Sequence, residues 1–344
     1  MQLSRVLRRI KSLELTVAEN KTEVVIFYKK EKPRLDIPVR VGGTEIYAQE
    51  HMKYLGLLID SKWSFKAYIG YVEQKVHKVT LGRVMPNLRG PRERKKRLYA
   101  NTIMSVIIYG APIWSETING SLKLQSKIKQ IQRPMAIRVV AGYRTISADA
   151  ALLLARIPPA MLYASYMKRV FMRVQELKDN DMWSKKEKEI KKEEEILMYR
   201  QWELYITRAS TAGVRTRDAI LPSFEKWMRR KHGELTFHVT QFFTGHGCFA
   251  TFLYRIGKLD TLTCQHCGRD DDSMEHTLSV CSIWRDERNE LVNVLGTEPE
   301  LRSIVPTICD NEDAWGAFKK FCVAVLLQKE REERLRQQQQ IESD

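Results

Sequence analysis

The chain has 344 residues, of which 58 are Lys or Arg and 42 are Asp or Glu, so its net charge is +16 and its pI is near 9.5. This length predicts about two domains with sizeable cores, and 43% hydrophobic with 29% charged residues is ordinary for a soluble protein. Residues 1–180 hold 33 Lys/Arg against 14 Asp/Glu, whereas residues 181–344 hold 25 against 28. The excess positive charge therefore lies in the first half and indicates a polyanionic partner.

The apolar pattern argues against membrane and secretory classes. The longest apolar run, from Ile103 to Trp114, is too short to cross a bilayer, and no apolar core follows the basic first ten residues. Neither end carries a basic amphipathic helix with an aromatic face, so we expect no membrane partner. Cysteines in a metal-binding pattern favour a reducing compartment, the nucleus or the cytoplasm.

Short β segments are predicted near the amino terminus, after an amphipathic helix over residues 1–15. A buried-type strand is predicted at 24–28, a hairpin turn at Gly42-Gly43, and a further strand at 54–60. From residue 64 the pattern becomes helical, and Pro134 is expected to kink one of the helices. The helices predicted in this part are 65–84, 92–109, 121–142 and one that Ser147 caps and Pro158-Pro159 ends.

The second half is predicted to be helical almost throughout. One long helical stretch is expected from 160 to 208, in which the mixed charges of 185–195 form a solvated face held by i,i+4 pairs. Thr211-Ala212-Gly213 is the predicted domain boundary. Helices are then expected within 220–260, at 284–295 and at 313–334, followed by a frayed tail at 336–340.

Four residues near the carboxyl terminus form a metal-ligand pattern with the spacing C-x2-C-x8-H-x4-C: Cys264, Cys267, His276 and Cys281. Three thiols and one imidazole are the full ligand set of a closed structural Zn²⁺ site. The polar loop at 269–273 has no apolar side chain to bury, so we expect the metal to organise it. The alternatives are a redox dithiol, which lacks its βαβ context, and chance among 6 Cys and 7 His.

Three further residues near this pattern are candidates for ligands. His266 is not expected to bind the metal, because its neighbours on both sides already do. His246 and Cys248 are either reserve ligands or, as we prefer, packing residues beside the knuckle.

A cluster of basic residues surrounds a proline-bounded turn and the helix start that follows it. Backbone N–H groups at a helix start favour anions, and adjacent cations suit phosphate contact without base readout. The alternative is a solvated or salt-bridged surface. The candidate nucleic-acid-binding residues are Arg83, Arg89, Arg92, Arg94, Lys95, Lys96 and Arg97.

An ordered series of short motifs resembles the carboxyl half of non-LTR (LINE-type) retrotransposon reverse transcriptases, of the clade that inserts into ribosomal-RNA genes and telomeric repeats. Each motif alone is weak, but their order along nearly the whole chain is specific. The motifs are Asn20-Lys21-Thr22-Glu23, Tyr54-Leu55-Gly56, Leu88-Arg89-Gly90-Pro91, Tyr109-Gly110-Ala111-Pro112-Ile113-Trp114, Ala141-Gly142-Tyr143-Arg144-Thr145, Ile157-Pro158-Pro159, Thr244-Gly245-His246-Gly247-Cys248-Phe249 and the zinc pattern.

The resemblance implies a mainly α protein with three parts. Residues 1–63 would be the end of a truncated polymerase palm with short β segments, and 64–210 a helical thumb with a long connecting helix. Residues 211–344 would be a helical carboxyl-terminal domain with a CCHC zinc knuckle at 264–281. The implied partners are RNA and DNA, namely element RNA and target DNA, and the parent polyprotein would carry an endonuclease and a Mg²⁺-dependent palm.

One departure from the family bears on catalysis. Such polymerases hold two divalent metals on palm aspartates, one set of which lies in a Tyr-Ala-Asp-Asp turn, and this sequence has no such turn. Asp36 and Asp60 each lack a neighbouring carboxylate, so no catalytic residue is assigned and the chain alone is not expected to polymerise DNA. Lys21 matches a palm lysine and is either vestigial or an ordinary surface residue. Pro134 also departs from the uninterrupted thumb helix of the family.

Two other functions remain open at this stage. The chain could be a free-standing host zinc-knuckle protein that binds nucleic acid, or the inert product of a decayed element. The sequence leaves open the choice between RNA and DNA and the oligomeric state.

Overall fold

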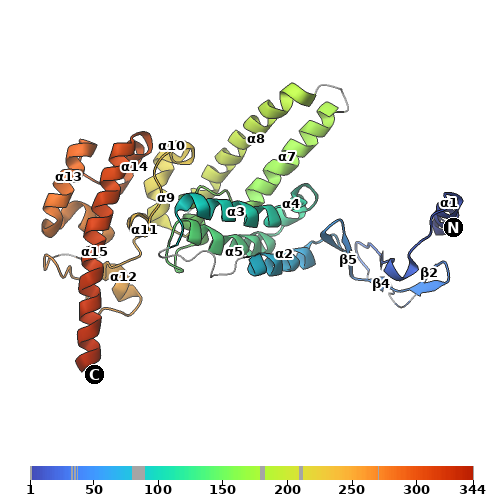
Figure 1. The fold of residues 1–344 in the computed structure, drawn as a ribbon, viewed down its shortest axis with the longest axis horizontal. Coiled ribbons are helices and arrows are strands. Elements are labelled where there is room, and N and C mark those ends of the chain that lie inside the picture. Colours follow the sequence, from blue (N-terminus) through green and yellow to red (C-terminus); the bar gives the residue numbers. More distant parts are fainter. Residues whose placement is uncertain are drawn as a thin grey trace.

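The computed structural model describes residues 2–31, 34, 36, 38–79, 90–178, 183–208, 212–269 and 271–343. These residues form a mainly helical body with an extended amino-terminal arm at one end, a protruding pair of helices, and a long final helix that projects from the other end (Figure 1). The predicted mainly α class is confirmed, as are the short β segments. In the described ranges, no helix combines the length and apolar character that crossing a bilayer requires.

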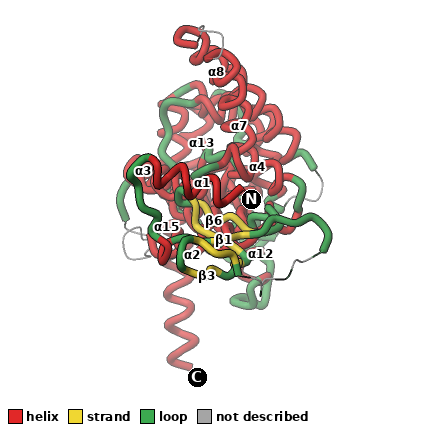
Figure 2. Tube along the Cα trace, turned by 90° about the vertical axis from the view of Figure 1, so that its right-hand side faces the viewer, coloured by secondary structure: helices red, strands yellow, loops and turns green. Residues whose placement is uncertain are grey.

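The described residues of the amino-terminal arm form six short strands in three two-stranded sheets, and strands of this arm are drawn in yellow in Figure 2. The predicted helix forms, but Val6 on its apolar face is 53% exposed. The predicted hairpin turn at Gly42-Gly43 is confirmed, whereas the strand expected at 24–28 is only two residues long. The elements are α1 (Gln2–Ser12), η1 (Glu19–Lys21), β1 (Val24–Val25), β2 (Val39–Val41), β3 (Thr44–Ile46), β4 (Ala48–Gln49), β5 (His51–Tyr54) and β6 (Leu57–Asp60).

The strand predicted at 54–60 is confirmed for residues 57–60, which form β6. Tyr54 belongs to the preceding strand, β5, because the chain reverses direction at Leu55 and Gly56. Both residues have positive φ angles, 46° and 84°, which produce the two-residue turn between antiparallel β5 and β6. The Tyr109 hydroxyl donates to the Leu55 carbonyl at 2.8 Å, and its ring lies against Gly56. The resemblance motif at 54–56 thus forms a turn that docks on the helical body.

The helical body begins with five helices whose buried faces share one core. The elements are α2 (Lys66–Val79), α3 (Glu93–Ile107), α4 (Ala111–Asn119), α5 (Leu122–Val139) and α6 (Ala148–Ala155). The Tyr109 carbonyl, in the turn between α3 and α4, accepts hydrogen bonds from the Tyr68 hydroxyl of α2 and from Trp114 Nε1 of α4, both at 2.8 Å. The fourth of these helices, in which a kink is predicted at Pro134, continues on both sides of that proline.

The long helical stretch predicted from 160 to 208 is instead an antiparallel pair, α7 (Ala160–Lys178) and α8 (Trp183–Ile206), which protrudes from the body (Figure 1). The charged run in α8 is also not simply solvated. Glu194 is 6% exposed and accepts from Arg169 and Arg173 of α7 at 2.5 and 2.9 Å. These pairs across the hairpin hold its two helices together, whereas the expected i,i+4 pairing is represented by Lys191 and Glu187.

The carboxyl-terminal half is a set of shorter helices packed around the long final helix. The tail expected to fray at 336–340 continues as helix. The buried core is continuous from Leu57 to Leu326, so it extends past the predicted boundary at 211–213. The elements are α9 (Val214–Ile220), η2 (Leu221–Ser223), α10 (Phe224–Arg229), α11 (Phe237–Thr244), α12 (Ala250–Arg255), η3 (His276–Val280), η4 (Ser282–Trp284), α13 (Arg285–Leu295), α14 (Leu301–Asp310) and α15 (Glu312–Ser343).

Candidate metal centre and basic surface

The first two candidate ligands come from a tight turn. The Gly268 amide donates to the Cys264 carbonyl at 2.8 Å, and Gly268 has a φ of +67°, which suits glycine. The Cys264 amide in turn donates to the Arg269 carbonyl at 3.2 Å. This turn directs the side chains of Cys264 and Cys267 to the same side, as the spacing predicts.

The other two candidate ligands come from the ends of a π-helical turn, η3. Cys281 follows His276 by five residues, and its amide donates to the His276 carbonyl at 2.8 Å, the i→i+5 bond that defines such a turn. The Ser273 hydroxyl accepts from the His276 amide at 3.0 Å and holds the start of the turn. The predicted short helix is thus present, with a π-helical hydrogen bond joining the two ligand residues.

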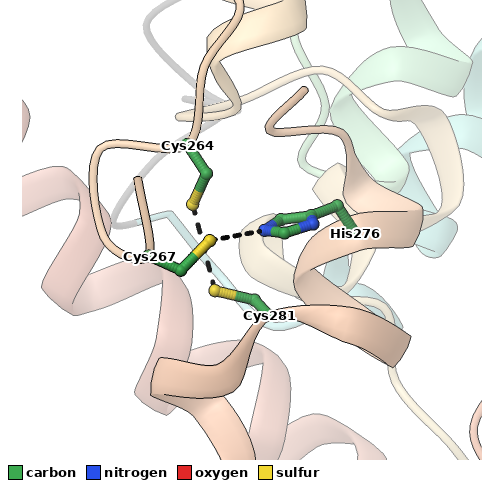
Figure 3. Close-up of side chains that lie close together, drawn as sticks. All are labelled: Cys264, Cys267, His276 and Cys281. Atoms are coloured by element: carbon green, nitrogen blue, oxygen red, sulfur yellow. Dashed lines mark hydrogen bonds between the residues drawn. The ribbon is translucent and has the colours of Figure 1, made fainter. Parts of the chain in front are cut away.

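The four ligand atoms converge on one point (Figure 3). They all lie within 4.8 Å of one another, with 3.9 Å between the Sγ atoms of Cys264 and Cys281 and 3.4 Å from Cys267 Sγ to His276 Nε2. A tetrahedral ion with Zn–S bonds of ~2.3 Å separates its sulfur ligands by roughly 3.8 Å. The side chains therefore fit a four-coordinate metal ion.

Burial shapes the chemistry of these thiols. Cys264 and Cys281 are both fully buried. Burial raises the pKa of the Cys264 thiol to about 12 and also raises the pKa of Cys281, because a thiolate without a counter-charge is poorly solvated there. A divalent cation supplies that counter-charge, and its binding would release protons from the thiols.

A buried ion pair that sequence reasoning missed supports the loop between the ligands. Both carboxylate oxygens of Asp272 lie 2.7 Å from Lys329 Nζ of α15, and the two side chains are 6% and 2% exposed. Asp272 also accepts from the Ala250 amide at 2.9 Å and from the Thr277 hydroxyl at 3.0 Å. One carboxylate thus ties the metal loop to α12, to η3 and to the final helix.

A second buried cation, Arg288 of α13, fixes the other side of the site. Its guanidinium donates to the carbonyls of Leu278 and Cys281 at 2.9 and 2.6 Å. Neither Arg288 nor Lys329 lies at a characteristic spacing from the candidate ligands in the sequence. The periodic apolar residues around them in α13 and α15 are the one sequence signal that they face inward.

The three neighbouring candidates lie outside the ligand cluster. His266 Nδ1 lies 3.0 Å from a carboxylate oxygen of Glu332, and its ring packs on Trp284. Cys248 lines a small pocket beside His266. His246 has its Nδ1 atom 2.9 Å from the Thr244 carbonyl. Within the described ranges, the four predicted residues are the one group of Cys, His, Asp or Glu found in a metal-binding arrangement.

The structure divides the predicted basic residues into outward and inward sets. Arg92, Arg94 and Lys95 are exposed at the start of α3, whereas Lys96 is only 5% exposed. Arg97 is partly buried and pairs with Glu93. Arg83 and Arg89 lie outside the described residues.

The inward set is organised by Glu93, whose side chain is 3% exposed. Its carboxylate accepts from Arg97 Nε at 2.7 Å and from the Leu235 amide at 2.5 Å. Burial lowers the pKa of Lys96, and the nearby Glu93 charge opposes that effect. Part of the basic segment thus joins α3 to the chain segment before α11.

Of the three residues considered as parts of a palm, only Asp60 has side-chain contacts among the described residues. Lys21 is exposed at the end of η1. The Asp60 carboxylate accepts from the backbone amides of Lys62, Ser64 and Phe65, at 2.6–3.1 Å, and so shapes the turn that leads into α2. Asp36 is exposed.

Two known proteins align with most of the chain. The Retrovirus-related Pol polyprotein from type-1 retrotransposable element R1 4 of Nasonia vitripennis is 21% identical, over 93% of this chain and 86% of that protein. The chain is a relative of retrotransposon Pol polyproteins. This Pol-related chain is also 25% identical to the Retrovirus-related Pol polyprotein from type-1 retrotransposable element R1 of Bradysia coprophila, over 73% of the chain but 26% of that protein.

These alignments confirm the predicted resemblance at the level of the family. The Pol-related chain spans about a quarter of the Bradysia coprophila protein and most of the Nasonia vitripennis one. No protein-family model and no solved structure matches the chain. The family assignment therefore depends on whole-chain similarity to the Pol proteins.

Proposed function

We propose that the chain is the carboxyl-terminal part of a non-LTR retrotransposon reverse transcriptase, which binds template–primer and target nucleic acid and carries no polymerase centre of its own. In this proposal, residues 1–63 are the end of the palm, 64–210 the thumb and 211–344 the carboxyl-terminal domain. The observation that carries it is the alignment of 93% of the chain with a Pol polyprotein. Mg²⁺ then belongs to the palm of the parent polymerase, and Lys21 is a vestige of that palm.

The metal of the carboxyl-terminal cluster is, in this proposal, a structural Zn²⁺. The support is chemical: three thiols and one imidazole, buried and spaced for a tetrahedral ion, suit Zn²⁺ better than oxygen-preferring cations. The four ligands leave no position for a substrate, so the ion would order the knuckle and would not act on substrate. Thiols kept reduced for zinc suit a nuclear or cytoplasmic location.

The proposed nucleic-acid contact lies at the start of α3. Arg94 and Lys95 are exposed there next to Arg92, so their charges are free to meet backbone phosphates. Lys96 and Arg97 would contribute by fixing the helix start and only indirectly to phosphate binding. Arg83 and Arg89, which precede α3 in the sequence, complete the proposed set.

A binding measurement on the whole zinc-loaded chain tests the proposal. Fluorescence anisotropy with single-stranded RNA, duplex DNA and an RNA–DNA hybrid should show binding at low ionic strength that weakens steeply as salt rises. The order of the three affinities would also identify the preferred nucleic acid. A chain that ignores all three polynucleotides at low ionic strength would overturn the proposed function.

A further inference from the structure

A buried arginine lies at the end of α10 with incomplete hydrogen bonding. Arg230 is 5% exposed, and its guanidinium lies over the rings of Trp227 and Trp315, 3.8 and 4.9 Å from their centres. Its Nη1 donates to the Trp227 carbonyl at 3.0 Å, but Nε and Nη2 have no acceptor among the described residues. Buried donors without acceptors are rare and often mark the place of an ion or water.

The surroundings of Arg230 carry an excess of positive charge. Arg156 Nη1 donates to the Arg230 carbonyl at 2.7 Å, and its own Nε also lacks an acceptor among the described residues. Burial and then repulsion from Arg156 lower the pKa of Arg230 to about 9, while Glu93 partly offsets this and Arg97 adds to it. Uncompensated buried charge is unfavourable, so an anion nearby would stabilise this cluster.

Arg230 lines an open pocket of about 450 Å³ between α10 and the end of α14. Arg229 pairs with Glu225 at 3.0 Å, and Lys226 pairs with Asp310, whereas Lys231 is exposed and has no ion pair with any described residue. Four cations therefore face two carboxylates, and the pocket keeps a net positive charge. Its charged lining residues are Glu225, Lys226, Arg229, Arg230, Lys231 and Asp310.

We propose that this pocket binds a phosphate group. Arg229 and Lys231 on the rim donate to its oxygens, and its negative charge offsets the buried guanidinium of Arg230. A phosphate suits the site because it carries the charge that the cluster lacks and accepts several hydrogen bonds from arginine. None of the residues that line the pocket belongs to the zinc cluster or to the exposed basic residues of α3, although Glu93 and Arg97 of α3 lie close enough to shift the pKa of Arg230. The phosphate comes either from a nucleic-acid backbone or from a free phosphate.

Thermal unfolding of the full zinc-loaded chain with inorganic phosphate tests the pocket. The double variant Arg229→Gln/Lys231→Gln removes the rim charges, and Lys258→Gln/Arg302→Gln removes the same charge from exposed positions elsewhere. Phosphate should raise the unfolding temperature more than chloride at equal ionic strength, in the parent chain and in the control. The rim variant should bind phosphate about tenfold more weakly or worse. Equal responses to phosphate and chloride, or a rim variant that matches the control, would overturn the proposal.

Two further measurements identify the source of the phosphate and test the role of Arg230. If an oligonucleotide competes with inorganic phosphate and loses affinity in the rim variant, the backbone is the source; unchanged oligonucleotide binding points to a free phosphate. Arg230→Met should lose the phosphate-dependent shift, and a folded Arg230→Met chain that keeps the full shift contradicts the role of Arg230. If that variant does not fold, the rim variant decides. The phosphate response is measured without polynucleotide, so it can succeed where the proposed function fails.

Discussion

The metal cluster and the basic start of α3 were both predicted from sequence, and they differ in how far the prediction reached. The four candidate ligands at 264–281 meet as their spacing predicts, because binding one metal ion would require fixed distances between their side chains. The basic residues at 92–97 share a charge but not a direction, and helical periodicity turns Lys96 inward while Arg94 stays exposed. The spacing of residues along the chain therefore predicts the geometry of a site, whereas charge density predicts only the sign of the partner's charge.

Both regions are also organised by a buried carboxylate. Asp272 joins the metal loop to α15 through Lys329, and Glu93 joins the start of α3 to Leu235 and Arg97. The difference lies in what each carboxylate supports: a closed, buried centre in one case and an open cationic surface in the other. Substituting single residues of each region tests this difference.

The largest expected effect follows loss of a metal ligand. Cys281→Ser should lower zinc affinity by more than the ~10–100-fold that loss of an outer hydrogen-bond partner produces, because a ligand is removed outright. Residues 262–281 should then exchange amide hydrogens rapidly, while α3 and α5 stay protected. Zinc titration and hydrogen exchange measure both, with Cys322→Ser, a buried thiol outside the cluster, as the control. Full zinc content and unchanged exchange in Cys281→Ser would remove Cys281 from the ligand set.

Features that depend on residues close together in the sequence were mostly predicted, whereas features that depend on distant residues were missed. Helices with clear caps, such as the one begun by Ser147, were located well because the cap is local. The α7–α8 hairpin was missed because its helices are joined by pairs such as Arg173 with Glu194, whose partners are distant in sequence. The turn at Leu55-Gly56 was missed because the apolar residues around it read as one strand. Asp272 and Lys329, 57 residues apart, gave no sequence signal of their pairing.

The next largest effect is expected from breaking the Asp272–Lys329 pair. Asp272→Asn leaves the Lys329 ammonium buried and only partly compensated, so the free energy of unfolding should fall by about 3–5 kcal/mol. Zinc affinity should also fall by roughly 10–100-fold, because the metal loop loses its anchor. Urea unfolding and zinc competition measure the two effects.

Two matched variants separate this pair from a general charge effect. Asp272→Asn/Lys329→Met removes both charges and should recover part of the lost stability. Glu290→Gln removes a surface partner of Lys320, whose side chain is 72% exposed, and should change stability by no more than ~0.5 kcal/mol. If Asp272→Asn behaves like Glu290→Gln, the carboxylate does not anchor the loop.

A smaller loss of stability is expected at Glu93. Glu93→Gln weakens the hydrogen bonds to Arg97 and Leu235 and removes the charge that faces Lys96, so unfolding should become easier by about 2 kcal/mol. Glu116→Gln, at a carboxylate 78% exposed beside Lys168, is the matched control and should be nearly neutral. Polynucleotide affinity should change little in Glu93→Gln. A fall in affinity without a fall in stability would show that Glu93 shapes the surface and not the core.

The smallest effect on stability, and the clearest effect on polynucleotide binding, is expected from replacing the exposed residues Arg94 and Lys95. Arg94→Gln/Lys95→Gln should leave the free energy of unfolding within ~0.5 kcal/mol, because neither side chain is buried. Its polynucleotide affinity should fall several-fold, and the slope of log affinity against log salt should flatten by up to ~2, about one for each lost phosphate contact. The control Lys188→Gln/Lys192→Gln removes the same charge from exposed positions of α8. Since net charge changes equally in both variants, a flatter slope in the α3 variant alone would assign the phosphate contacts to the start of α3, and equal slopes would assign them elsewhere.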